Sequence, residues 1–417
     1  MSDKSSRKTW TQPWSYREGT IVTVAILLLG FVIQAAAAGI VLRVAAFPWN
    51  LVAGLIFLAL LISTFVIWQK HPVIKWLGGV KAALPAILGF TFLVLLMGFV
   101  KQDVESKSAL VRTLGLTHLV KTWPFILINL YLMILLGAVT LKRLSPFTMK
   151  NAGFFLNHFG LFVVLFSTAL GSSDMRQATM NCYENEIEHN GLDVSGKPIE
   201  FPFEIKLLNF NIDEFRPKVT IVDNQSGQIV EQKGKVQYEV LDRNALDLYN
   251  YQLEVEQFLG TSGKVGEAYV SSNEPGSAPS AKVKMTNKDD GTIISGWICS
   301  GSYANHSEAL KLSDQYSLVM LPAEPRKFSS ELSIQTESGK QVTTTIEVNR
   351  PFHIDGWTIY QLSYNTEMGR WSDLSVLELV CDPWLPVVYF GIFLMMGGAA
   401  FLFITGKPKN GGTDYVA

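Results

Sequence analysis

Charged residues are scarce in this chain, and neither sign is in excess. Asp, Glu, Lys and Arg make up 17% of its 417 residues, against 48% hydrophobic residues, and the formal net charge is −1. So little polar surface excludes an ordinary soluble enzyme and predicts a protein integrated in the lipid bilayer. The near-neutral charge provides no basic surface for nucleic acid, so no nucleic-acid partner is expected.

Cysteine is sparse as well. The chain has Cys182, Cys299 and Cys381 and no Cys-x-x-Cys pair. This excludes a thioredoxin-type dithiol carrier and, without Cys-x-x-Cys-His, a protein that binds haem covalently. All three lie in or beside the polar block described below, where an oxidising compartment permits one disulfide; whether Cys182 pairs with Cys299 stays open.

Long apolar runs are abundant. Six of them could cross about 30 Å of hydrocarbon. They lie near residues 20–42, 50–69, 83–100, 123–141, 152–171 and 385–405. The first run follows basic residues and contains Ala35 to Ala38, so it also fits a cleavable signal peptide, although its length favours an uncleaved helix.

These runs divide the chain into five predicted parts. They are a cytoplasmic N-terminus (1–19), a five-helix transmembrane region (20–172), an extracytoplasmic β domain (173–383), a sixth transmembrane helix (384–405) and a cytoplasmic tail (406–417). Most of the Lys and Arg near the spans lie in both termini and in two loops, one with Lys70, Lys75 and Lys81 and the other with Lys142, Arg143 and Lys150. The positive-inside rule makes those loops cytoplasmic.

In the polar block, apolar and polar residues alternate, which predicts an all-β domain. Phe203, Ile205 and Leu207 share one predicted face. Residues 332–336 and 342–348 are predicted to form a hairpin around Gly339. The Gly, Ser and Pro residues between Gly260 and Ser280 predict a long surface loop.

His158 is the most informative polar residue within the spans. If its helix begins near Ala152, six residues at 1.5 Å each place the imidazole about 9 Å inside the cytoplasmic boundary. An ionisable residue at that depth is a functional-site hypothesis, and neutral imidazole is a common ligand of haem iron. The alternative is an interfacial histidine that bonds a neighbouring helix or points to the headgroups beside Asn157.

The other histidines do not complete a haem site with His158. His118 lies at the outer end of the fourth span, about 20 Å of membrane depth from His158. His71 sits in a loop beside Pro72, where a solvated turn residue is the simpler reading. His189, His306 and His353 lie in the polar block. A second axial ligand is therefore expected from another polypeptide.

Several motifs in the second half of the chain carry a family resemblance. They are His158-Phe159-Gly160-Leu161, the stretch from Phe203 to Phe210, Val348-Asn349-Arg350-Pro351-Phe352, the stretch from Asp355 to Tyr364, and Asp382-Pro383 before the last span. In this order they resemble the ResB (CcsB) family of System II cytochrome c biogenesis proteins. The resemblance covers about residues 152 to 403.

The resemblance implies a function and a location. ResB-like proteins act with, or are fused to, a CcsA/ResC protein in the bacterial cytoplasmic (inner) membrane. Together they deliver haem to the outer, periplasmic face and attach it to c-type apocytochromes. His158 matches the family's membrane-embedded histidine, which implies an axial ligand to haem b shared with the partner. The chain would then be a non-autonomous subunit of a cytochrome c synthase (haem lyase) complex.

The sequence departs from the family pattern in two ways. Four spans precede the helix of His158, whereas the familiar arrangement has about two, so the first two helices have no role by analogy. The tryptophan-rich signature of the CcsA half, Trp-Gly-x-x-Trp-x-Trp-Asp, is missing from the sequence. The chain is therefore expected to be insufficient alone for haem attachment.

Other residues near the motifs fit structural roles. Trp357, Tyr360 and Tyr364 have strand spacing and, with Gln361, fit packing better than contact with an apocytochrome. Arg350 and Arg370 are candidates to attract haem propionates, although exposed arginines are usually only solvated. Asp382-Pro383 fits a carboxylate cap with proline in the first helical turn.

Two classes of function remain open from the sequence. One is the haem-delivery subunit; the other is a non-catalytic membrane scaffold or sensor whose β domain binds a protein. A transporter acting alone is weaker, because the spans have no obvious internal repeat and few polar residues. No nucleophile, base and orienting residue form a pattern that supports an independent enzyme.

Overall fold

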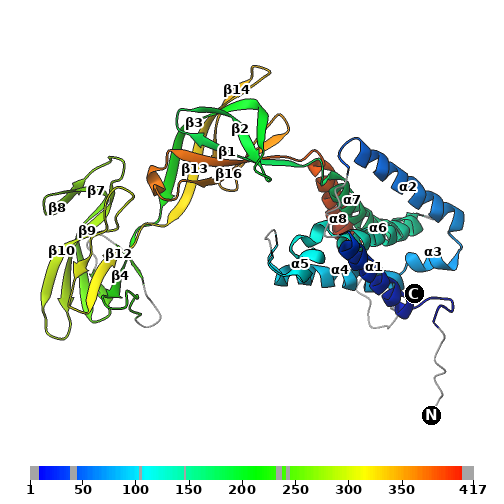
Figure 1. Cartoon of the computed structure of the whole chain (residues 1–417), viewed down its shortest axis with the longest axis horizontal. Coiled ribbons are helices and arrows are strands. Elements are labelled where there is room, and N and C mark those ends of the chain that lie inside the picture. The colour runs from blue at the N-terminus through cyan, green and yellow to red at the C-terminus, as the bar shows by residue number, and fades with distance from the viewer. Residues whose placement is uncertain are drawn as a thin grey trace, which may run out of the picture. The chain divides into compact units, whose positions relative to one another are not determined.

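A computed structural model describes residues 9–37, 45–102, 106–144, 147–231, 237–240 and 245–405. The chain divides into two compact units. The first joins Met1–Met175 to Asp382–Ala417, and the second is Arg176–Cys381. The first unit is helical and the second is built of strands (Figure 1).

The helical unit contains six helices that are long and apolar enough to cross a membrane. They are α1 (Tyr16–Ala36), α2 (Trp49–Trp68), α4 (Val80–Phe99), α6 (Trp123–Leu144), α7 (Ala152–Gly171) and α8 (Leu385–Thr405). Short helices connect them: α3 (Pro72–Leu77), α5 (Ala109–Thr113), η1 (Leu116–Lys121) and η2 (Met149–Asn151). The six predicted spans are confirmed, and the β unit follows the fifth of them. Most of the predicted first run beyond Ala36, residues 38–42, lies outside the described residues.

Close contacts between backbones hold α1 against α4 and α6. A Cβ added at Gly19 of α1 would lie 2.3 Å from the carbonyl oxygen of Lys81 in α4. One added at Gly30 would lie 2.4 Å from the Cα of Pro124 in α6. The first helix is thus an integral part of a packed three-helix core, a structural role that the family resemblance did not supply.

Glycines also set the packing of α7 on α8, which run side by side (Figure 1). A Cβ at Gly160 of α7 would lie 2.5 Å from the carbonyl oxygen of Gly391. A Cβ at Gly398 of α8 would lie 2.6 Å from the backbone nitrogen of Asn157. Because small residues let two helices approach closely within a membrane, α7 and α8 act as one packed pair.

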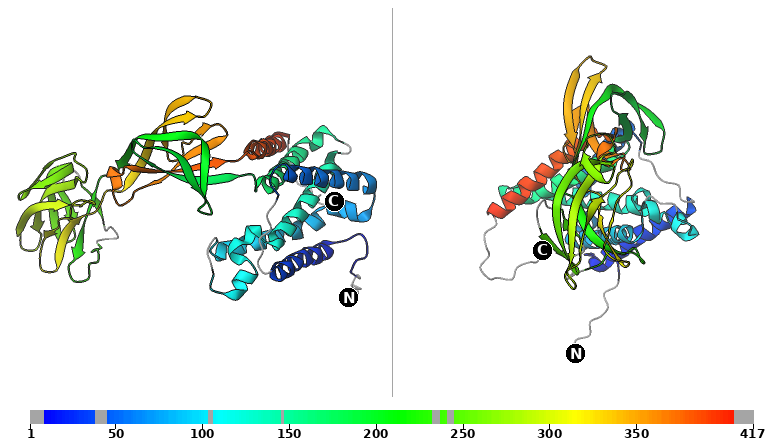
Figure 2. Two further views of the ribbon diagram at one scale, coloured as in Figure 1. Left: turned by 45° about the horizontal axis from the view of Figure 1, so that its top comes forward. Right: turned by 90° about the vertical axis from the view of Figure 1, so that its left-hand side faces the viewer.

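The β unit has two lobes, seen as two separate groups of strands in Figure 2. The first lobe consists of β1 (Arg176–Tyr183), β2 (Ile187–Asp193), β3 (Pro198–Glu214), β13 (Pro325–Thr336), β14 (Gln341–Glu347), β15 (Phe352–Ile354), β16 (Trp357–Tyr364) and β17 (Leu374–Cys381). Its sheet has the order β14-β13-β3-β2-β1-β17-β16-β15, and neighbouring strands are antiparallel. The sheet curls until β14 approaches β16, so it nearly closes into a barrel.

Alternation of side chains builds the core of the first lobe, as predicted. Phe203, Ile205 and Leu207 are buried in one cluster with Trp357. Strands β13 and β14 form the predicted hairpin, with Gly339 at φ 82° in its turn. The β15–β16 hairpin turns through Asp355 and Gly356, both at positive φ, which is the backbone of a tight two-residue turn.

The second lobe is inserted between β3 and β13. Its strands are β4 (Lys218–Asp223), β5 (Tyr238–Glu239), β6 (Ala245–Leu248), β7 (Tyr251–Val265), β8 (Ala268–Ser271), β9 (Ala278–Asn287), β10 (Ile293–Cys299), β11 (Leu310–Lys311) and β12 (Tyr316–Met320). They form two sheets, β10-β9-β7-β6 with β8 beside β7, and β11-β12-β4-β5. Both sheets contribute to a single buried cluster, so they pack face to face.

The predicted surface loop between Gly260 and Ser280 is wrong. Strand β7 continues to Val265, β8 returns from Ala268, and β9 begins at Ala278. The small residues Ala278 and Ser280 are buried in the sheet rather than exposed. The single hydroxyl proton of Ser262 is donated to the carbonyl oxygen of Ala278, and the hydroxyl groups of Ser262 and Ser280 lie 2.7 Å apart. Serine at this position therefore satisfies a buried backbone carbonyl group instead of marking a loop.

All three cysteines are free. Cys182 is buried in the core of the first lobe, whereas Cys299 is buried in a small cluster of the second lobe with Tyr269. The disulfide between Cys182 and Cys299 that the sequence left open is not formed.

Candidate functional site

His158 lies on the second turn of α7 in a short stack of side chains. Its imidazole stacks on the ring of Phe154, with ring centroids 3.7 Å apart and planes 18° apart. The guanidinium of Arg143, near the end of α6, lies 4.6 Å from the centroid of the same Phe154 ring. His158 is half-buried, and its ring is held by packing against Phe154.

One hydrogen bond fixes which nitrogen of His158 is available. Nδ1 lies 2.9 Å from the carbonyl oxygen of Phe154. A carbonyl oxygen only accepts hydrogen bonds, so Nδ1 carries the proton and donates it. In the neutral ring, Nε2 then keeps its lone pair, which is the arrangement that orients a histidine for a metal. The carbonyl oxygen of Phe154 thus engages Nδ1 of His158 and leaves Nε2 as the nitrogen with the free lone pair.

The neighbouring residues of α7 face elsewhere. Asn157 donates a weak hydrogen bond of 3.5 Å from Nδ2 to the carbonyl oxygen of Met395 in α8. Gly160 packs on α8, and Phe162 packs near Gly137 of α6. His158 therefore projects from a sector of α7 that differs from its contact with α8.

Within the described residues, no group of three or more His, Cys, Asp or Glu side chains could hold a metal ion. His118 lies in η1. His71 is exposed and caps α3, where its ring nitrogen accepts a hydrogen bond from the backbone of Val73 at 3.3 Å. His189, His306 and His353 are exposed on the β unit. In the helical unit, His71 and His118 therefore join no such group with His158.

Gln361 of the family-like segment is part of a buried polar network. Its Oε1 accepts a hydrogen bond of 2.5 Å from the hydroxyl of Ser330, and its Nε2 donates to the hydroxyl of Ser375 at 3.0 Å. The two serines also bond each other at 2.7 Å. Trp357 is buried in the core, and Tyr364 packs against Phe210. These side chains therefore pack inside the lobe, which is the structural role that their strand spacing predicted.

Replacing Gln361 with leucine should destabilise the β unit by about 1–3 kcal/mol, because Ser330 and Ser375 would lose partners inside the lobe. The free energy of unfolding, measured by denaturant titration of the purified chain, checks this. Leu362→Ala is the matched control, since that neighbouring side chain is exposed. Equal unfolding midpoints for both variants would contradict a stabilising network.

The two candidate arginines are engaged in ion pairs. Arg350 lies 3.5 Å from the carboxylate of Glu347, and Arg370 lies 3.4 Å from that of Glu214. Asp382 accepts a hydrogen bond of 2.9 Å from the backbone nitrogen of Trp384. This is the predicted cap before α8.

A polar junction that the sequence did not reveal lies where α2 begins, α7 ends and α8 begins. The carboxylate of Asp174 accepts three hydrogen bonds: from the backbone nitrogen of Phe47 at 2.7 Å, from Nδ2 of Asn50 at 2.6 Å and from Nε1 of Trp384 at 2.7 Å. The indole of Trp384 covers Gly171, where a Cβ would lie 2.6 Å from it. Asp174 thereby ties α2 to the α7–α8 pair.

Removing the carboxylate with Asp174→Ala should lower stability by about 2 kcal/mol, because charge-assisted hydrogen bonds are lost and the buried Asn50 loses one acceptor. Trp384→Phe, which removes a single donor, should cost less. Melting temperatures of the purified chain in detergent rank the variants by stability. A lower melting temperature for Trp384→Phe than for Asp174→Ala would contradict the conclusion that the Asp174 carboxylate joins the three donors.

The junction also predicts a pH dependence. Burial of Asp174 opposes ionisation, but the hydrogen bonds from Phe47, Trp384 and Asn50 outweigh it and lower the pKa of the carboxyl. A lowered folded pKa means that its stabilisation is complete above the ordinary value of about 3.9 and is lost as the pH falls through the lowered pKa. The difference in melting temperature between wild type and Asp174→Ala should therefore stay constant from about pH 8 to 5 and shrink only in more acidic buffer.

Comparison with known families gives one match. The model of the ResB-like family matches residues 310–373, a segment that runs from β11 through the β15–β16 hairpin. The resemblance inferred from the sequence motifs is thereby confirmed over this segment. No curated protein matches the chain.

Proposed function

We propose that this chain, whose β unit matches the ResB-like family, is a subunit of a membrane complex that delivers haem across the membrane and supports its covalent attachment to c-type apocytochromes. The partner in the complex is a CcsA/ResC-like membrane protein. The observation that carries the proposal is His158, a histidine inside a spanning helix whose Nδ1–H is bonded to its own backbone.

His158 has the properties of one axial ligand to a haem b iron. The bond to Phe154 holds the ring in the tautomer whose Nε2 is free to bind iron. The flat contact with the Phe154 ring resists rotation of the imidazole. Haem is cargo in this proposal, so His158 must release the iron as well as bind it. One axial histidine from this chain, with the second from the partner, suits such transient binding.

Arg143 adds a charge near the same helix. Its guanidinium lies over the Phe154 ring, and the residue is exposed. A cation beside a haem site is suited to a propionate carboxylate. We assign Arg143 the role of positioning one propionate of the haem that His158 binds.

The β unit is proposed to lie on the periplasmic side of the bacterial cytoplasmic membrane. The distribution of Lys and Arg between the loops supports this orientation. With its two well-packed cores, the unit would serve as a rigid platform for an apocytochrome or for the outer part of the partner. Catalysis of thioether formation would then rest on the assembled complex.

Co-expression tests the proposal. The chain, purified with a CcsA-like partner, should carry haem with a b-type absorption spectrum, and a strain that lacks the chain should fail to mature c-type cytochromes. A complex that is free of haem, together with normal maturation in the deletion strain, would favour the alternative of a non-catalytic scaffold or sensor.

A further inference from the structure

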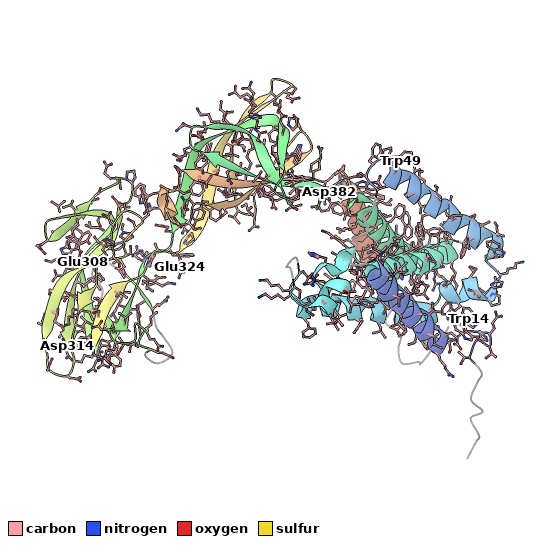
Figure 3. All side chains as sticks on the ribbon, viewed as in Figure 1. Trp14, Trp49, Glu308, Asp314, Glu324 and Asp382 are labelled. Atoms are coloured by element: carbon pink, nitrogen blue, oxygen red, sulfur yellow. The ribbon has the colours of Figure 1, made fainter. Side chains whose placement is uncertain are left out.

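Both connections between the β unit and the spanning helices leave from one end of the first lobe. Arg176, the first residue of β1, lies opposite Cys381, the last residue of β17. The next residues outward belong to the helix ends. The backbone nitrogen of Met175 donates to the carbonyl oxygen of Gly171 at 3.2 Å, and Asp382, labelled in Figure 3, caps α8. No free linker therefore separates this end of the lobe from α7 and α8.

The length of α7 sets the depth at which its last residue lies. Its 20 residues span about 30 Å at about 1.5 Å each, which is the thickness of the hydrocarbon core. Gly171 is then at the edge of the hydrocarbon, and the headgroups extend about 5–8 Å beyond it. Met175 is bonded back to Gly171, and Arg176 follows one residue, about 3.8 Å, later. The start of β1 therefore lies at the level of the headgroups.

The turn between β2 and β3 reaches this same end of the lobe. Asp193 lies opposite Ala178, two residues from the start of β1, and the two strands are antiparallel. Val194 follows Asp193 in the direction of Arg176. The turn is therefore at the level at which β1 begins.

Hydrogen bonds build this turn around one carboxylate. Asp193 accepts from the backbone nitrogen and the hydroxyl of Ser195 at 2.8 and 2.7 Å, and from the backbone nitrogen of Lys197 at 2.9 Å. Gly196 has a φ of 77°, which glycine adopts without strain. The shape of the turn is thus fixed by its own residues, without a partner.

The turn presents apolar side chains to its surroundings. Val194 is 83% exposed and Leu192 is 50% exposed. Leu192 lies opposite Thr179, whose neighbours in β1, Ala178 and Met180, belong to the buried core. Because side chains alternate along a strand, Thr179 and Leu192 face outward. Turns favour Gly, Pro, Asn, Asp and Ser, so Val194 has no role in forming the turn.

Basic side chains accompany these apolar ones. Lys197 closes the turn and Arg176 begins β1, and both are exposed. Such neighbours suit the boundary of a bilayer, because the charged ends reach phosphate groups while the stems lie along apolar surroundings. The β15–β16 turn is at the same end of the lobe, but its residues Asp355 and Gly356 offer no apolar contact.

We propose that the β2–β3 turn, residues 192–197, rests in the headgroup layer of the bilayer. Leu192 and Val194 contact the upper part of the acyl chains, and Lys197 lies among the phosphates. The partner is the lipid that surrounds α7 and α8, because the turn and both helix connections share one end of the lobe. This contact adds a third support to the two strand connections, so the lobe does not pivot freely about them. The proposal does not depend on haem delivery.

A fluorescent probe in the turn tests this contact. The full-length chain with Cys381→Ser and Val194→Cys is labelled with nitrobenzoxadiazole, because Cys182 and Cys299 are buried and do not react. The labelled chain is placed in nanodiscs of phosphatidylcholine. Emission should shift to shorter wavelength, and phosphatidylcholine with a nitroxide near the headgroup end of an acyl chain should quench it.

Val265→Cys in the same Cys381→Ser background is the matched control. Val265 is 64% exposed and precedes the β7–β8 turn of the second lobe. That lobe follows the end of β3 that is opposite the β2–β3 turn. Its probe should keep the emission of a group in water, with or without the nitroxide lipid.

Two further variants separate lipid contact from mere proximity. Leu192→Asp, added to the Val194→Cys chain, places a charge against the acyl chains, so quenching should fall severalfold. Ile187→Asp, at the opposite end of β2 and 61% exposed, should leave quenching unchanged. Both changes affect exposed side chains, so melting temperatures should match that of the parent chain.

Three results would overturn the proposal. The probe at position 194 could be quenched no more than the probe at position 265. Quenching could persist at full strength in Leu192→Asp, which would show that the turn does not contact the acyl chains. A shift of emission without quenching would identify contact with protein, such as a second copy of the chain, instead of lipid.

Discussion

Replacing His158 with alanine is expected to remove haem from the complex of this chain with its CcsA-like partner and to abolish c-type cytochrome maturation. In the proposed complex, His158 supplies one of the two axial imidazoles of the haem iron. Alanine at position 158 has no group that can bind the iron. Absorption spectra of the reduced and oxidised complex, normalised to protein, should show a loss of at least tenfold in bound haem. Even outer partners of a metal ligand change affinity by about 10–100-fold, so loss of a ligand itself should not have a smaller effect.

Two controls distinguish ligation from packing in this experiment. Imidazole added to a His158→Gly complex should restore part of the spectrum, which a purely structural histidine would not allow. His118→Ala, a change in η1, should leave the spectrum unchanged. An unaltered haem content in His158→Ala, with normal maturation, would contradict the assignment.

Gly398→Leu is expected to have a large structural effect. A Cβ at this position would lie 2.6 Å from the backbone nitrogen of Asn157 and 2.8 Å from the carbonyl oxygen of Gly153. Backbone atoms cannot rotate away, so α8 must separate from α7 at a cost of about 3 kcal/mol or more. Because the turn that carries His158 is part of this contact, haem content should fall together with stability.

The preceding residue provides a matched control. Gly397 has no atom within 4 Å of an added Cβ, so Gly397→Leu adds the same side chain to the same helix without a clash. Size-exclusion profiles and melting temperatures of the two variants should differ clearly, with Gly397→Leu close to wild type. Two equally stable variants would show that α7 and α8 do not require their close contact.

The spans and the β hairpins could be predicted because their signals are local. A run of apolar residues predicts a spanning helix wherever it occurs, and alternation in β3 predicted the buried face of Phe203, Ile205 and Leu207. The same local reasoning failed between Gly260 and Ser280. Small residues there predicted a loop, yet they fill the narrow space between packed strands.

The surroundings of His158 were only partly predictable. Stacking on Phe154 follows from a spacing of four residues on a helix, which places both rings on one face. The contact of Gly160 with Gly391 and the bond of Asp174 to Asn50, which are 124 residues apart, join distant segments. No local pattern encodes such pairings, so the junction of α2, α7 and α8 emerged only from the structure.

Replacing the imidazole at position 158 with a thiol tests most directly the claim that His158 binds the haem iron. Electron paramagnetic resonance of the oxidised complex should show low-spin haem with two imidazole ligands in wild type. In His158→Cys, the account predicts that this signal is replaced by one characteristic of thiolate ligation, because the new side chain binds the same iron. Identical spectra for wild type and His158→Cys would show that the haem is held elsewhere and would contradict the role proposed for His158.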